Sequence, residues 1–194
     1  MELAAEVTAL LALTAIRNQD KIGLILFSDR IVKYIPPRKG RDSVMRLVRE
    51  VLAAEDDAQG GTDVEGALKF LNGVQKRRAV VFLVSDFLGT RGDSLLRATA
   101  RRHDLICVPV SDPAESELPD VGLVELEDPE TGELVLADTS SASVRRAFAA
   151  QAEQENEELK KFFAKTGIET LPISTDKPYV DAVRRLFHRR ARKR

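Results

Sequence analysis

The stretch Ala79-Val-Val-Phe-Leu-Val84 is the strongest indicator of fold class in this chain of 194 residues. Every residue in it is apolar, and the polar pair Ser85-Asp86 follows directly. An uninterrupted apolar run of this length, ended by polar residues, is typical of a strand covered on both faces, as in a parallel sheet. Open α/β sheets place their functional groups beyond the carboxyl ends of such strands. The stretch therefore predicts a central strand with a candidate site at its end.

Helices and strands alternate outward from this stretch. The spacing of apolar residues predicts helices over 1–17, 44–52, 64–71, 93–102 and 141–166, and strands over 22–27, 31–35, 105–110 and 168–173. The strand at 31–35 follows so closely on 22–27 that it must pair with it antiparallel, at an edge. This alternation predicts an α/β fold of three layers, with a mainly parallel, Rossmann-like sheet, forming one domain over residues 1–194.

Residues at the ends of these elements predict where each begins and stops. Pro36-Pro37 is expected to close the second strand, and Asp42 or Ser43 to cap the helix that follows. Gly167 is the predicted stop of the long helix, and Pro178 opens a terminal helix.

An acidic segment interrupts the alternation. Nine carboxylates and no Lys or Arg lie between Glu115 and Asp138. Within it, residues 121–127 and 133–137 predict two strands joined by a turn that contains Pro and Gly. We therefore expect a β-hairpin around residues 121–137, inserted into the α/β fold.

Composition narrows the functional classes. With 43% hydrophobic and 31% charged residues the sequence predicts a globular, soluble protein, and its net charge of −1 gives no bias toward nucleic acid or anionic membrane. The basic end at 184–194 is interpreted as a solvated, frayed helix end, with a phosphate- or lipid-binding patch as the alternative. A single Cys107, no signal peptide and no apolar run of membrane-spanning length predict a cytoplasmic protein.

Polar residues next to the predicted strands and helices are the candidate site residues. Asp86, with Ser85 and waters, can help to hold a hard divalent cation, or it can be an ordinary turn residue. Thr62 begins a capping box with Glu65, so its hydroxyl serves either the helix or a metal. Asp63 is equally explained as an acid in the first helical turn, where the helix dipole favours it.

The sequence lacks the motifs of common enzymes. It contains no Walker loop, no Gly-x-Gly-x-x-Gly fingerprint, no zinc-ligand spacing and no Gly-x-Ser-x-Gly elbow. The remaining enzymatic alternative is a Mg²⁺-dependent hydrolase that uses a strand-end Asp as its nucleophile. Because Ser85-Asp-Phe-Leu88 lacks the Asp-x-Asp of haloacid-dehalogenase-type enzymes, we expect no enzymatic activity.

Segments along nearly the whole chain resemble the bacterial family called domain of unknown function 58. Among them are Gly60-Gly-Thr-Asp63, Leu83-Val-Ser-Asp-Phe87 and Arg102-His-Asp104. That family is related to von Willebrand factor A domains and is often encoded beside MoxR-type AAA+ ATPases. The resemblance implies a non-enzymatic protein-binding module that partners such an ATPase, with Thr62, Asp63, Asp86 and Phe87 in the contact surface.

The resemblance also implies a metal site and its defect. In von Willebrand factor A domains, a metal-ion-dependent adhesion site combines an Asp-x-Ser-x-Ser after the first strand, a Thr from a second loop and an Asp after the fourth strand. Thr62 and Asp86 match the second and third parts, whereas this sequence starts in the helix that follows the first. We therefore expect an incomplete site and weak or absent binding of Mg²⁺.

A central strand is implied to be missing between those at 22–27 and 79–84. Its absence exposes unpaired backbone groups on both neighbours. We expect these strands either to pair directly or to exchange strands between copies, which would give a homo-oligomer. A further interpretation is that the chain is a fragment of a longer family member, whose function depends on residues outside it.

Overall fold

The computed structural model describes residues 2–17, 19–54, 61–87, 93–113, 117–127 and 134–191. The predicted alternation of helices and strands is confirmed, and the hairpin turn predicted at 128–132 lies outside the described residues. In chain order the elements are α1 (Glu2–Arg17), β1 (Ile22–Phe27), β2 (Ile31–Arg38), α2 (Arg41–Ala53), α3 (Val64–Val74), β3 (Val80–Ser85), α4 (Asp93–Arg102), β4 (Asp104–Ser111), β5 (Leu123–Glu127), β6 (Leu134–Asp138), α5 (Ala142–Thr166), β7 (Glu169–Thr170), β8 (Ile173–Ser174) and α6 (Val180–Ala191).

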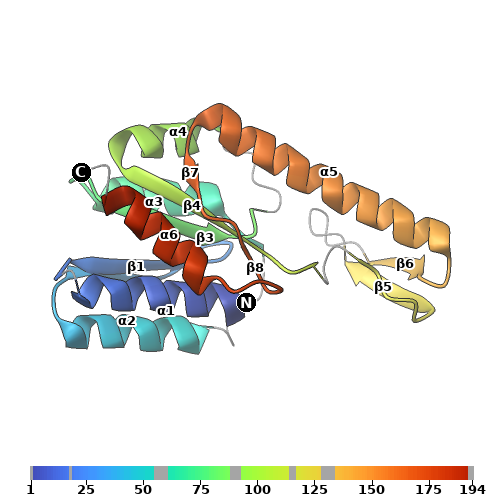
Figure 1. Cartoon of the computed structure of the whole chain (residues 1–194), viewed down its shortest axis with the longest axis horizontal. Coiled ribbons are helices and arrows are strands. Elements are labelled where there is room, and N and C mark those ends of the chain that lie inside the picture. The colour runs from blue at the N-terminus through green and yellow to red at the C-terminus, as the bar shows by residue number, and fades with distance from the viewer. Residues whose placement is uncertain are drawn as a thin grey trace.

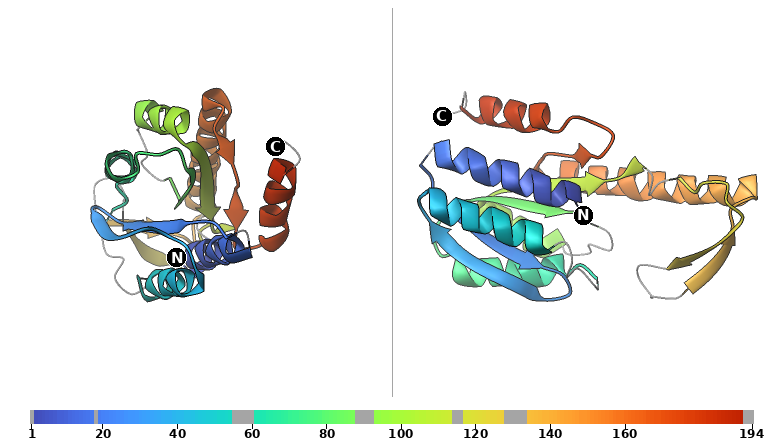
Figure 2. Two further views of the ribbon diagram at one scale, coloured as in Figure 1. Left: turned by 90° about the vertical axis from the view of Figure 1, so that its left-hand side faces the viewer. Right: turned by 90° about the horizontal axis from the view of Figure 1, so that it is seen from below.

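Two layers of helices enclose the strands of the main body. Helices α1, α2 and α6 lie on one side, and α3 and α4 lie on the other (Figures 1 and 2). The sheet is mainly parallel, as predicted: β4 pairs in parallel with β3 on one edge and with β7 and β8 on the other. With neighbours on both edges and helices on both faces, β4 is the most buried strand, and Ile106, Cys107 and Val108 are each 0% exposed.

β1 and β2 pair antiparallel, as the short link between them requires. The expectation that Pro36-Pro37 closes β2 is wrong, because the strand continues to Arg38, which lies opposite Ile22. Among the described strands β2 pairs only with β1, so its outer edge needs no N–H donor and tolerates proline. Gly23 faces this proline segment, and a Cβ there would lie 2.8 Å from the Ile35 carbonyl oxygen.

Three predicted boundaries differ from the structure. α2 is preceded by Gly40 at φ 103°, so its start depends on a glycine in the left-handed region and not on Asp42 or Ser43. The strand predicted at 168–173 is divided into β7 and β8 around Pro172, which has no N–H to donate. The first helical hydrogen bond of α6 runs from the Val183 N–H to the Tyr179 carbonyl, so Tyr179 is the N-cap residue. Pro178 therefore lies one residue before the cap and not in the first turn.

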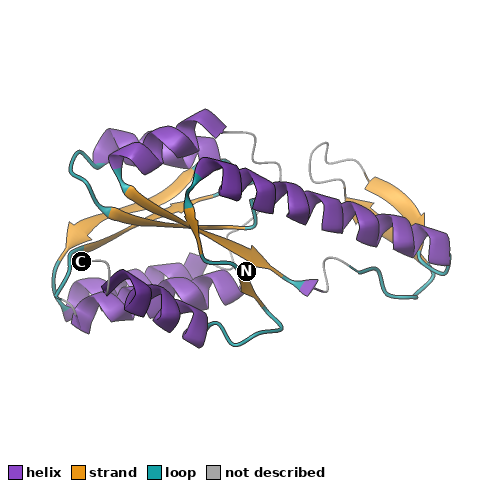
Figure 3. Cartoon of the chain, turned by 45° about the horizontal axis from the view of Figure 1, so that its top comes forward, coloured by secondary structure: helices purple, strands orange, loops and turns teal. Residues whose placement is uncertain are grey.

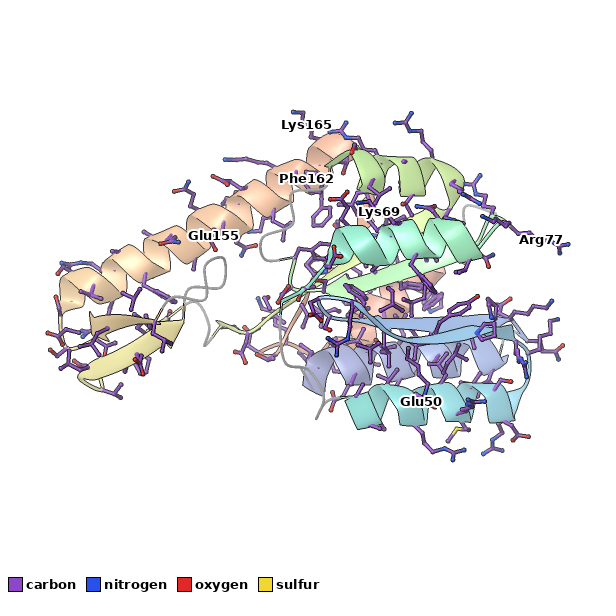
Figure 4. The ribbon with its side chains drawn as sticks, turned by 180° about the vertical axis from the view of Figure 1, so that it is seen from behind. Glu50, Lys69, Arg77, Glu155, Phe162 and Lys165 are labelled. Atoms are coloured by element: carbon purple, nitrogen blue, oxygen red, sulfur yellow. The ribbon has the colours of Figure 1, made fainter. Side chains whose placement is uncertain are left out.

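Helix α5 and the β5–β6 hairpin extend away from the main body (Figure 1). The antiparallel hairpin is confirmed, with Leu123 opposite Asp138. Gly167 ends α5 in the left-handed conformation at φ 66°, as predicted. Where α5 joins the body, Phe163 is buried and its ring meets that of Phe87 edge-on with centroids 5.2 Å apart, and half-buried Phe162, labelled in Figure 4, packs beside it.

The sheet is split between β1 and β3. Among the described strands β1 pairs only with β2, and β3 pairs only with β4, so the expected direct pairing of β1 with β3 does not occur. The residues of both strands line one groove of about 3120 Å³. β1 was predicted to be covered on both faces, but all of its residues except exposed Gly23 are only half-buried. An open edge leaves them less enclosed than those of β4.

Candidate functional site

The groove between β1 and β3 carries the candidate residues at one of its ends. β1 and β3 run in the same direction, so their carboxyl ends lie at the same end of the body (Figure 1). The strands lie between layers of helices (Figure 3). Ser28 follows β1, Asp86 follows β3, and both line the groove together with Thr62 from the loop before α3. The Asp63 N–H donates to the Ser28 carbonyl at 2.7 Å, which ties that loop to the end of β1. The structure thus places Thr62 and Asp86 at the rim of the groove, at the carboxyl ends of β1 and β3, and their role in holding a metal or a partner stays a prediction.

The capping box predicted for Thr62 and Glu65 is wrong. The N-cap of α3 is Asp63, whose Oδ1 accepts the Gly66 N–H at 2.8 Å. Glu65 instead pairs with Lys69 one turn along, at 2.7 Å. Thr62 lies one residue before the cap and is exposed, so the helix does not use its hydroxyl. Thr62 is therefore available to a ligand at the rim, whereas the Asp63 carboxylate already stabilises α3.

Asp86 is exposed at the rim, while both of its chain neighbours are buried. The Ser85 hydroxyl donates to Asp86 Oδ1 at 3.3 Å and accepts the Phe87 N–H at 3.1 Å. Phe87 holds a left-handed backbone conformation at φ 61°, which is costly for a large residue. Its side chain is only 4% exposed in the core, so the expectation that it contacts a partner is wrong for this conformation.

The body of the groove is apolar and bounded by both helical layers. From α1 it is lined by Leu3, Leu10 and Leu11, and from α3 by Leu68 and Leu71. Sequence reasoning named the rim but not this groove, because no motif marks it. The sequence signal that could have predicted the groove was the expected pair of strands at 22–27 and 79–84, whose facing edges lack a partner.

Polar groups at the amino end of the groove are held in ion pairs. Arg190 of α6 pairs with Asp104 and Glu169, and Arg189 reaches Glu169 at 2.7 Å. The interpretation of 184–194 as a solvated, frayed helix end is therefore wrong for its described part, which is helical and tied to β4 and β7. Arg77, labelled in Figure 4, follows the last turn of α3 and lies at this same end.

The rim side chains do not fit a complete magnesium site. Mg²⁺ requires near-octahedral coordination by about six oxygens. Among the described residues no group of three or more His, Cys, Asp or Glu is placed to hold a metal ion. Thr62 offers one hydroxyl and Asp86 one carboxylate at the rim, and the Ser85 hydroxyl is turned to its own strand end. A cation there would keep most of its water shell.

Comparison with known proteins gives the family. A family model described as "Protein of unknown function DUF58" matches residues 1–158. The chain belongs to this family. An uncharacterized protein of Mycobacterium tuberculosis (strain ATCC 25618 / H37Rv) is 29% identical over 193 residues, which is 97% of this chain and 60% of that protein. An uncharacterized protein of Mycobacterium avium is 32% identical over 159 residues, 80% of this chain and 94% of that protein. The chain thus spans about three fifths of the M. tuberculosis relative.

A solved structure shares the fold. It is the crystal structure of an aerotolerance-related membrane protein from Bacteroides fragilis, with a TM-score of 0.54 and 14% identity, covering 92% of this chain and 84% of that one. At this identity the likeness shows the fold alone. Within the described part of the present chain, no helix has the length and apolar character needed to cross a membrane.

Proposed function

We propose that this DUF58 chain is a non-enzymatic protein-binding module of the von Willebrand factor A-like type, and that it binds a MoxR-type AAA+ ATPase. The observation that carries the proposal is the rim at the carboxyl ends of β1 and β3. There Thr62 and Asp86 are exposed, on loops held by the N-cap of α3 and by the Asp63–Ser28 backbone bond. Loops that a rigid scaffold positions commonly carry the residues that bind a partner, and the rim presents its polar groups in this way.

The rim is poorly equipped for catalysis. The described residues place neither a His nor a Cys there: His103 and Cys107 are both 0% exposed, and His188 lies in the last turn of α6, beside the ion pairs at the amino end of the groove. An aspartate nucleophile for phosphoryl transfer requires a metal to neutralise the phosphate, and the rim offers too few ligands to hold one. Turnover of a phosphatase substrate with Mg²⁺ that is abolished by Asp86→Asn would overturn the non-enzymatic proposal.

Magnesium is proposed to bind weakly or not at all. With two protein side chains at the rim, we expect a dissociation constant weaker than ~1 mM, the weak end of the range for hard cations in protein sites. Isothermal titration with MgCl₂ measures this directly. Saturable binding in the micromolar range, lost in Asp86→Ala, would contradict the proposal of an incomplete site.

The binding function is tested with the purified ATPase encoded in the same genome. We expect saturable binding by biolayer interferometry, weakened about tenfold or more by Thr62→Ala and by Asp86→Ala, since central polar contacts contribute about 1.4 kcal/mol or more. Asp42→Ala is the matched control, because Asp42 is an exposed acid in the first turn of α2, at the opposite end of β1. Absence of binding by the wild-type chain, or equal weakening by the control, would refute the proposal.

A further inference from the structure

One face of the β5–β6 hairpin carries three exposed leucines. Residues directly opposite each other in an antiparallel pair share a face, and so do alternate residues of one strand. Leu123 lies opposite Asp138, and Glu125 lies opposite Leu136. Leu134 is two residues from Leu136 and shares its face. Leu123, Leu134 and Leu136 are 67%, 63% and 67% exposed. We call these five residues the outer hairpin face.

The opposite face of the hairpin is better covered. Val124, Leu126 and Ala137 are half-buried there. A two-stranded hairpin by itself is only marginally stable in water, and packing against a helix is one way to stabilise it. Exposed apolar residues that are grouped together and rimmed by polar ones mark surfaces for contact with another protein. The outer hairpin face is therefore a candidate surface for docking a helix.

The charges on the outer hairpin face are negative. Glu125 and Asp138 lie among the leucines, and both are exposed. Arg145 of α5 donates to backbone carbonyls at the base of the hairpin and pairs with Asp120, outside this face, at 3.2 Å. A complementary helix must therefore present apolar side chains together with basic ones.

Helix α2 has this combination on its solvent side. Residues three or four apart lie on the same face of a helix, and Arg41, Met45, Arg49 and Leu52 follow this spacing. All four are exposed, Met45 by 38% and Leu52 by 49%. We call them the α2 stripe. Basic and apolar side chains alternate along it, while Val44, Leu47 and Val51 bury the other side of the helix.

The other charged residues of α2 leave this surface basic. Residues 38–53 contain five basic and two acidic residues. One of the acids, Glu50, is half-buried and pairs with Lys33 at 3.0 Å and with Arg46 at 3.9 Å. The other, Asp42, is exposed in the first turn, beside Arg41. The net charge of this segment is thus opposite to that of the outer hairpin face.

The two surfaces also match in length and in repeat. Residues four apart along α2 are separated by about 6 Å, and the stripe from Arg41 to Leu52 extends about 16 Å at a rise of 1.5 Å per residue. β5 and β6 are five residues long each, which gives about 13–17 Å, and side chains on one face recur every ~6.6 Å. One helix face therefore covers the hairpin from end to end.

A second copy of the chain must supply the helix. Within one chain, α2 lies in the main body and the hairpin lies at the far end of α5, so the two surfaces do not meet (Figures 1 and 2). Two outer hairpin faces in contact would place acid against acid. α6 exposes Arg184 and Arg185, but its apolar residues Val183 and Leu186 are buried, so it offers charge without an apolar stripe.

We propose that the outer hairpin face of one copy of this chain binds the α2 stripe of a second copy, with leucines packed on Met45 and Leu52 and carboxylates beside Arg41 and Arg49. Two such contacts, one in each direction, close a pair with twofold symmetry. This association exchanges no strand and is separate from recognition by the rim. Thr62→Ala leaves it intact, and its failure leaves the proposed function intact.

Sedimentation equilibrium of the full chain measures the association. We expect a two-chain species at about 100 µM in low salt, with a dissociation constant that rises about tenfold or more in Leu136→Ser. Val180→Ser is the matched control, because Val180 is 44% exposed on α6, outside both surfaces, and its replacement should leave the constant unchanged. A chain that stays monomeric, or equal weakening by the two variants, overturns the proposal.

Mixing two variants locates the contact. Leu136→Ser damages the hairpin side and Leu52→Ser the α2 side, so a mixed pair keeps one intact contact, whereas each variant alone keeps none. The equimolar mixture should therefore associate about threefold or more tightly than either variant alone. A mixture no tighter than its components overturns the proposal, because a contact of hairpin with hairpin gives that result.

Charge reversal tests the complementarity of the two surfaces. Glu125→Lys and Arg49→Glu should each raise the dissociation constant about tenfold or more in low salt, since each places like charges across the contact. The double variant restores opposite charges and should associate about threefold or more tightly than either single variant. Both residues are exposed, so circular dichroism should show each variant folded. Losses that add in the double variant overturn the proposal.

Discussion

Replacing Asp63 by Ala is expected to destabilise the protein, whereas replacing Thr62 by Ala is not. The Asp63 carboxylate accepts the Gly66 N–H at 2.8 Å, and loss of an N-cap side chain costs about 1 kcal/mol, within about 0.5–2. Loss of a negative charge at the start of α3 adds about 0.3–1 kcal/mol. The expected total of about 1–2 kcal/mol lowers the midpoint of thermal unfolding by about 2–8 °C for a chain of this size.

Urea unfolding followed by circular dichroism measures the difference, and two further variants sharpen it. Asp63→Asn should keep most of the stability, because Asn caps helices as well as Asp. Gly66→Ala should lose less than Asp63→Ala, because a Cβ 2.1 Å from Asp63 Oδ2 displaces the cap while Ala is favoured over Gly in a helix by about 1 kcal/mol. A loss of about 1 kcal/mol in Thr62→Ala, with Asp63→Ala unchanged, would refute the assignment of the cap.

Three further predictions concern groups away from the rim. Burial, aided by two nearby arginines, lowers the pKa of His103, so the unfolded chain binds this proton more readily and the free energy of unfolding should fall as the pH drops below about 6.5. His103→Leu should flatten the dependence of that free energy on pH between about pH 7.5 and 5.5 in urea titrations, and an unchanged dependence would contradict this cause. Burial raises the pKa of Cys107 to about 12, so a thiol-reactive dye at pH 8 should modify this thiol only in denaturant. Rapid labelling of the native protein would show instead that the thiol is accessible. Arg190→Met should lower the free energy of unfolding by about 1–3 kcal/mol, because Arg190 pairs with two acidic side chains, whereas Arg184→Met at an exposed position should change it by about 0.5 kcal/mol at most. Equal changes in the two variants would show that the paired charges contribute nothing to stability.

The fold class was predictable from the sequence because the apolar runs are unambiguous. Continuous apolar residues at 79–84 and 105–110 predicted two buried parallel strands, and β3 and β4 are paired in that way. Gly167 stopped α5 at the expected residue, since only glycine readily takes the left-handed conformation found there. These features depend on local pattern, which a single sequence carries in full.

Boundaries and caps were less predictable, since several side chains competed for one role. Thr62 and Asp63 both have oxygens suited to cap a helix, and backbone geometry selected Asp63. Gly40 displaced two conventional caps, because its left-handed backbone turns the chain into α2. Pro36-Pro37 was taken as a strand end, yet an outer edge makes proline harmless.

The candidate site was predictable in part. Topology alone placed Asp86 and the loop of Thr62 at the carboxyl ends of parallel strands, and the structure has them on one rim. The burial of Phe87 was not predictable, because it follows from a left-handed turn that no sequence motif announces. The separation of β1 from β3 also depends on long-range packing, since local pattern allowed them to pair.

The openness of the sheet between β1 and β3 is tested most directly by hydrogen exchange of the ligand-free chain, with its oligomeric state measured on the same sample by light scattering. In a monomer, the amides of β4, which has strand neighbours on both edges, should exchange much more slowly than the groove-facing amides of β1 and β3. A monomer in which residues 22–27 and 80–85 are as fully protected as 104–111 would contradict the split sheet.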